Sequence, residues 1–103
     1  MIVYEVNIRV AASIAVDYAA WLAAHVAEIR RLPGFVDARV FAVEEMPPPE
    51  SDAEQRLCVH YHLQDRAALQ RYLREDAPRL RRDGVERFAD QVHVHRRVLE
   101  PRD

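Results

Sequence analysis

The chain has 103 residues, half of them apolar, and a formal net charge of −2 at pH 7. This length and composition predict a single folded domain with a substantial apolar core. The charge disfavours nucleic acid and anionic membranes as partners, and no apolar run approaches the roughly 20 residues of a transmembrane helix.

Two absences narrow the chemistry further. The chain has no Lys, and all fifteen of its basic residues are Arg, so neither a Schiff base nor a lysine general base can form. Two glycines, Gly34 and Gly84, are too few for a phosphate-binding loop or a dinucleotide fingerprint.

The single Cys58 excludes an intrachain disulfide, and "MIVYEVNIRV" lacks the features of a signal peptide. We therefore expect a cytoplasmic protein.

The first half of the chain predicts a strand, a helix and a second strand. Apolar side chains alternate with other side chains over residues 2–10, which is typical of a strand. Over residues 13–32 the spacing of Tyr18, Leu22 and Ile29 changes to a helical period, with Ser13 as the expected N-cap and Pro33 just beyond the end. Alternation returns over residues 35–43.

The second half predicts a third strand, a second helix and a fourth strand. A polar loop with three consecutive prolines spans residues 44–55, and a third strand follows over residues 56–63. Asp65 is placed to cap a second helix that breaks or restarts near Pro78 and continues toward Phe88. Residues 92–99 form the last predicted strand.

The order of these elements, βαββαβ, predicts an α+β fold of the ferredoxin-like type. Right-handed crossovers place the first and third strands in the centre of a four-stranded antiparallel sheet, with both helices on one face. The nearly all-apolar face suits the helices; its residues are Tyr4, Val6, Ile8, Val36, Ala38, Val40, Leu57, Val59, Tyr61, Leu63, Val92, Val94 and Val98. The other face mixes polar residues with apolar ones such as Phe41 and Leu99, which predicts a homodimer through the sheet.

Several segments resemble one family across nearly the whole chain, from Met1 to Glu100. They are "MIVYEV", "WLAAHVAEI", "GFVDARV" and "LQRYLREDAPRLRRDGVERF" followed by "RRVLE". They resemble short bacterial proteins of a domain-of-unknown-function family, number 4286. The resemblance implies the dimeric α+β-barrel fold and a homodimer, with no assigned activity. Wider relatives of this fold include cofactor-free monooxygenases, small isomerases and mutarotases, haem-dependent enzymes and ligand-sensing domains.

Four histidines lie in two pairs, His60 with His62 and His93 with His95, and each pair shares one face of its strand. Imidazoles near the carboxylate of Glu5 are suitable ligands for a divalent metal. However, the two pairs are separated by the first strand, about 9.5 Å apart, which is at the limit for ligands of one ion. We expect no metal there, and we expect these histidines to fill a polar dimer interface.

His25 is the stronger candidate, because its helical position turns it toward the sheet. It would meet Trp21, Tyr4 and Tyr61 there and form a small-molecule pocket with an acid/base group. The resemblance also implies a histidine at this position, followed three residues later by an acid, here Glu28. The alternative is a core histidine that is hydrogen-bonded to a tyrosine hydroxyl.

The sequence therefore predicts one domain over residues 1–100, with a tail at 101–103, that binds a small cyclic or aromatic molecule between the first helix and the sheet. Catalysis without a cofactor would use His25 as acid/base and Tyr4 or Tyr61 as its hydrogen-bond partner. Two other hypotheses stay open. One is a non-catalytic dimerisation or regulatory module, and the other is a metal- or haem-binding protein that uses the strand histidines or His25.

Overall fold

The protein is described by a computed structural model over residues 1–102; the last residue of the expected tail, 103, lies outside the described residues. The main elements are β1 (Ile2–Ala11), α1 (Ala15–Arg30), β2 (Phe35–Ala42), β3 (Glu54–Leu63), α2 (Arg66–Glu75), α3 (Ala77–Phe88) and β4 (Val92–Leu99). The predicted order is confirmed, with the second helix divided into α2 and α3.

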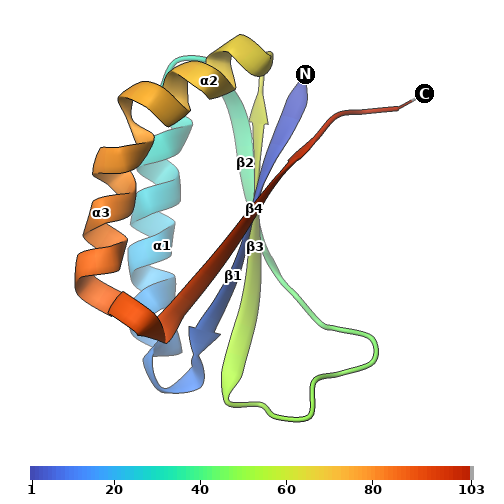
Figure 1. Ribbon diagram of the computed structural model, residues 1–103, viewed down its shortest axis with the longest axis vertical. Helices are drawn as coiled ribbons and strands as arrows, with labels where there is room; N and C mark the ends of the chain where they lie inside the picture. Colours follow the sequence, from blue (N-terminus) through green and yellow to red (C-terminus); the bar gives the residue numbers. More distant parts are fainter. Residues whose placement is uncertain (103) are drawn as a thin grey trace.

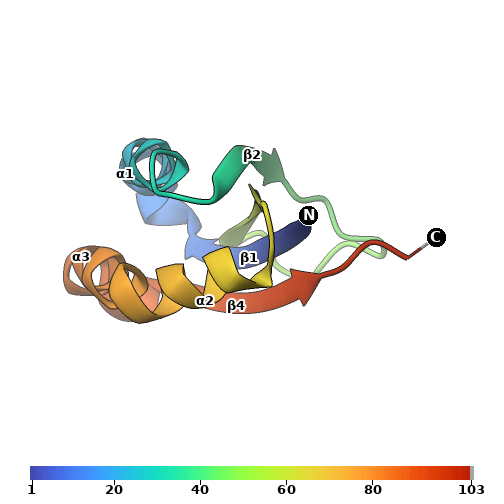
Figure 2. The ribbon, with the colours of Figure 1, turned by 90° about the horizontal axis from the view of Figure 1, so that it is seen from above.

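The four strands form one antiparallel sheet in the order β2-β3-β1-β4, as the crossover rule predicts. Tyr4 of β1 pairs with Tyr61 of β3 on one side and with Val98 of β4 on the other. Figures 1 and 2 show all three helices on one face of this sheet, while the other face carries no helix. We call these the helix-covered face and the open face.

Local signals explain most of the helix boundaries. The Asp65 carboxylate caps α2 by accepting a hydrogen bond from the backbone N–H of Ala68 at 2.9 Å. Pro78 lies in the first turn of α3, where its missing N–H costs nothing. The expected N-cap at Ser13 is wrong: a 3-10 turn over Ala12–Ile14 comes first, and α1 has no side-chain cap.

The core lies between the helices and the two central strands. Val10, Val59 and Leu63 of the central strands are fully buried, and Ile29 of α1 packs with them in the same cluster. At the start of β2 a bulge shifts the register between residues 35 and 37, so Phe35 packs against the cluster. The predicted inward position of Val36 is therefore wrong, and its residue is 52% exposed.

Two segments project to the open side of the sheet. Both views show the β2–β3 loop, residues 43–53, and the chain after β4 extending away from the helices (Figures 1 and 2). The open face also exposes apolar side chains, including Phe41 and Val43. None of the described helices is long and apolar enough to cross a membrane.

Candidate functional site

A cavity of about 110 Å³ lies between α1, α3 and the helix-covered face of the sheet. Its aromatic and histidine lining comprises Tyr4, Tyr18, Trp21, His25, Tyr61 and Tyr72. The structure thus brings together the four residues that the sequence proposed for a pocket, namely Tyr4, Trp21, His25 and Tyr61. Aliphatic side chains of the central strands, such as Val6 and Val59, complete the inner wall.

Trp21 is held in place by α3. Its indole N–H donates a hydrogen bond to the Asp83 carboxylate at 2.6 Å. The next residue, Gly84, allows close approach of the helix, because a Cβ there would lie 2.8 Å from Cη2 of Trp21. Phe88 packs against the same ring in an edge-to-face arrangement, with 5.7 Å between centroids. These three contacts orient the indole against which His25 lies.

His25 stacks on Trp21, with ring centroids 4.5 Å apart and planes inclined by 20°. The imidazole lines both the cavity and a second, more open groove between α1 and α3. Burial lowers the pKa of His25 below its ordinary value of 6.5, and the charges of Glu28 and Asp83 only partly oppose this. The imidazole is therefore mainly neutral at pH 7 and can accept a proton.

The tyrosines around the cavity act as hydrogen-bond donors. Burial raises the pKa of Tyr18 and of Tyr72 to about 12, and it raises the pKa of Tyr61 as well. These phenols therefore keep their protons throughout the physiological range. The hydroxyl of Tyr4 accepts a hydrogen bond from Nη2 of Arg81 at 2.8 Å, which leaves its own proton free to donate. Near neutral pH, His25 is the natural base of this lining.

Sequence reasoning missed Arg81 and Arg96, both of which line the cavity. Arg96 could have been found, because it shares strand parity with Val92, Val94 and Val98 on the helix-covered face, where a charged residue is unexpected. Arg81 had no comparable signal, since its contact with Tyr4 spans 77 residues of sequence. The helix glycine Gly84 was a further signal, because a glycine inside a helix often marks close packing.

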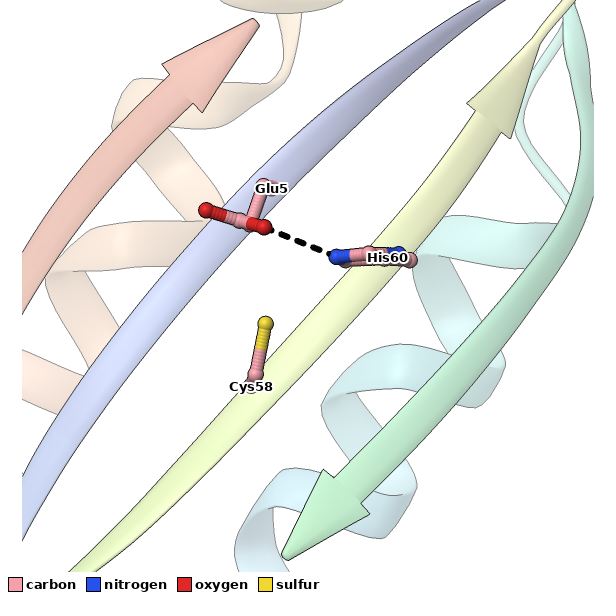
Figure 3. A group of neighbouring side chains, drawn as sticks. All are labelled: Glu5, Cys58 and His60. Carbon is pink, nitrogen blue, oxygen red and sulfur yellow. Dashed lines mark hydrogen bonds and ion pairs between the residues drawn. The ribbon is translucent and has the colours of Figure 1, made fainter. Parts of the chain in front are cut away.

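The open face carries a different cluster, centred on Glu5, which is only 5% exposed (Figure 3). Its carboxylate accepts hydrogen bonds from Asn7 Nδ2 at 2.7 Å and from Arg97 Nε at 2.6 Å. Nε2 of His60 lies 2.9 Å from the second carboxylate oxygen, and Cys58 lies beside the pair. The hydrogen bond from Arg97 is the main reason why the pKa of Glu5 falls from 4.5 to about 2.

This cluster bears on the metal hypothesis. Within residues 1–102, the one group of three potential ligand residues is Glu5, Cys58 and His60, so it contains a single strand histidine. Both oxygens of Glu5 already have partners, one of them a guanidinium cation. Burial and the charge of Glu5 raise the pKa of the Cys58 thiol, which disfavours the thiolate that zinc requires. The donor set fits an ion-pair network better than a metal site.

The strand histidines and His25 lie on opposite faces of the sheet, as the sequence predicts. His25 lines the cavity on the helix-covered face, whereas His60 is bonded to Glu5 on the open face. In the register of the sheet His93 pairs with Arg9 and His95 with Asn7, on the side of β1 away from His60. The strand histidines therefore do not converge on one point.

The fold defines the class: an α+β protein of the dimeric α+β-barrel type, with a four-stranded antiparallel sheet and its helices on one face. Residues 1–102 match the family Domain of unknown function (DUF4286), and the chain belongs to that family. This confirms the resemblance that the sequence segments indicated.

Solved structures of the same fold are similar over almost the whole chain. A candidate antibiotic biosynthesis monooxygenase from Deinococcus radiodurans has 14% identity and a TM-score of 0.73, over 100% of this chain and 94% of that chain. SnoaB, a cofactor-independent oxygenase from Streptomyces nogalater, has 18% identity and a TM-score of 0.63, over 99% and 94%. MhuD, a haem degrader from Mycobacterium tuberculosis, has 17% identity and a TM-score of 0.61, over 96% and 94%. No curated protein sequence matches the chain.

Proposed function

We propose that the protein binds a small cyclic or aromatic molecule in the cavity between α1, α3 and the sheet. The observation that carries this proposal is the meeting of Tyr4, Trp21, His25 and Tyr61 around one hollow. Apolar and aromatic walls with a few convergent polar groups are typical of small-molecule sites. The solved structures of similar fold add support, since two of them are described as an oxygenase and a haem degrader.

The size of the cavity limits the ligand. An apolar cavity of about 150 Å³ holds benzene, whereas sites for drug-sized ligands run to roughly 300–1,000 Å³. The volume of about 110 Å³ therefore suits a single ring, with any larger substituent directed through the opening. It is too small for a haem macrocycle without rearrangement, which disfavours the haem alternative.

His25 is the proposed acid/base group for cofactor-free catalysis, with Tyr4 or Tyr61 as hydrogen-bond partner. A lowered pKa keeps the imidazole unprotonated at neutral pH, as a general base requires. The competing interpretation requires a hydrogen bond from His25 to a tyrosine hydroxyl. Among the side-chain hydrogen bonds of residues 1–102 there is none to His25, whose ring instead stacks on Trp21.

The test replaces His25 by Ala and measures binding of single-ring probes, including phenol, benzoate and benzamide, by ligand-observed NMR. We expect wild type to bind at least one probe and the His25→Ala variant to lose most of that binding while its circular dichroism stays native. His62→Ala, on the open face, is the matched control and should bind normally. A His25→Ala variant that unfolds would instead support the core-histidine interpretation.

A homodimer through the open face is the second part of the proposal, and it also keeps the non-catalytic dimerisation module as an alternative. Phe41 and Val43 on that side are 43% and 40% exposed, although both are apolar. The β2–β3 loop and the C-terminal chain extend on the same side, where they could contact a partner subunit (Figure 1). Light scattering across a hundredfold dilution tests this; a monomer mass at every concentration would refute it.

The unpaired Cys58 fits a cytoplasmic location.

A further inference from the structure

The charged residues of the cavity lining are all of one sign. The lining includes Arg81 from α3 and Arg96 from β4, together with the titratable His25, and it contains no Asp or Glu. This is unexpected in a chain that has 17 acidic residues and a net charge of −2. The local charge of the cavity is therefore opposite to that of the whole protein.

Neither arginine is neutralised by the protein. In the described part of the chain, no carboxylate lies within ion-pair distance of Arg81 or Arg96, whereas nine of the other thirteen arginines have an ion-pair partner. Arg79 on the same helix as Arg81 pairs with Glu28 and Asp76, and Arg97 beside Arg96 pairs with Glu5. Arg96 and Arg97 are neighbours on β4, and neighbouring residues of a strand point to opposite faces. Arg97 therefore points to the open face and Arg96 to the cavity side.

Both arginines are placed where they can donate hydrogen bonds to a ligand in the cavity. Arg81 is half-buried, and its hydrogen bond to the Tyr4 hydroxyl holds the guanidinium at the cavity wall. Arg96 lines the same cavity, and its charge acts on Tyr18, Tyr61 and Tyr72 in the direction that lowers their pKa values, against the larger effect of burial. Both guanidinium groups have N–H donors to spare.

The exposed members of the lining show where the cavity opens. Val85 on α3 is 67% exposed and Val94 on β4 is 39% exposed, and Arg96 on β4 is exposed as well. The opening therefore lies between α3 and β4, with Arg96 at its rim. A ligand anion at this rim would stay partly hydrated, which avoids the large cost of burying a charge completely.

We infer that the ligand is a small aromatic or cyclic carboxylate, whose ring lies among the tyrosines and Trp21 and whose carboxylate accepts hydrogen bonds from Arg81 and Arg96. The planar guanidinium group matches a carboxylate and forms the stronger, charge-assisted type of hydrogen bond. The tyrosine hydroxyls add donors and no negative charge. This inference rests on the proposed small-molecule function and names the class of its ligand.

The experiment compares matched acid and amide probes by isothermal titration calorimetry: benzoate with benzamide, and cyclohexanecarboxylate with cyclohexanecarboxamide. We expect each acid to bind at least about tenfold more tightly than its amide, as charge-assisted hydrogen bonds predict. The Arg96→Met variant should remove most of that preference. Arg96 is exposed and lies on the edge strand β4, so we expect this variant to keep the native fold. Arg81→Met should also reduce it.

Arg82→Met is the matched control, because Arg82 lies on α3 next to Arg81 but outside the lining. It should keep the acid preference of wild type. Amides that bind as tightly as the acids would overturn this inference and leave the proposed function standing. Failure of all four probes to bind would overturn this inference, and failure of phenol to bind as well would overturn the proposed function. An acid preference that survives Arg96→Met and Arg81→Met, or that falls equally in Arg82→Met, would also overturn the inference.

Discussion

The two faces of the sheet handle charge in opposite ways. On the open face, one carboxylate, Glu5, is surrounded by three donors, namely Asn7, His60 and Arg97. On the helix-covered face, two guanidinium groups, Arg81 and Arg96, border an apolar cavity without a carboxylate. Glu5 is nearly inaccessible even though no helix covers it, whereas the arginines keep unused donors. A satisfied charge contributes to the fold, and an unsatisfied one at a cavity is available to a ligand.

The difference depends on side-chain parity, because residues next to each other on a strand point to opposite faces. Arg96 and Arg97 are adjacent in sequence, yet the first lines the cavity and the second pairs with Glu5. His62 and Leu63 on β3 likewise point to opposite faces of the sheet. Changes at such neighbouring pairs therefore test the two faces separately.

The largest effect should come from Leu63, which is fully buried on the helix-covered face. Leu63→Ala should lower the free energy of unfolding by about 2–5 kcal/mol, because it removes apolar contacts and leaves a cavity. His62→Ala, one residue earlier on the open face, should change it by only about 0.5 kcal/mol. Urea unfolding of both variants at pH 7 makes the comparison. Similar losses in the two variants would contradict the assignment of faces.

Much of this contrast could be predicted from the sequence, because strand alternation and helix signals are local. The Asp65 cap and the restart near Pro78 follow from residues close together in the chain, and the strand order follows from the order of the elements and the crossover rule. The same alternation places His25 and His60 on opposite sides of the sheet.

Other features depend on contacts that the sequence pattern does not contain. The bulge at the start of β2 turns Phe35 inward and Val36 outward, and a single inserted residue of this kind leaves no clear mark on the alternation. The hydrogen bond from Trp21 to Asp83 depends on how α1 and α3 rotate against each other. The existence of a cavity likewise depends on tertiary packing, so the sequence could propose its lining residues but not its volume.

As pH falls, the free energy of unfolding should decrease in two steps, one from each face of the sheet. The larger step belongs to Glu5. Its pKa is about 2 in the folded protein and 4.5 without these contacts, so the unfolded chain binds the proton first as pH falls. This contribution is complete above pH 4.5 and is lost as pH falls toward 2. With allowance for solvent near the open face, we expect a loss of about 2 kcal/mol. Urea unfolding at a series of pH values should show a clearly smaller loss in Glu5→Gln.

The smaller loss in the same titration belongs to His25 and begins at higher pH. Burial lowers the pKa of His25 in the folded protein below 6.5, so the unfolded chain again binds the proton first. Its contribution is complete above pH 6.5 and declines below it, before the Glu5 window is reached. His25→Gln should remove this first decline and leave the second, whereas Glu5→Gln should do the reverse. An NMR titration of the His25 imidazole with a midpoint at or above 6.5 would contradict its burial beside the cavity, and the base proposed for that face would then be charged at neutral pH.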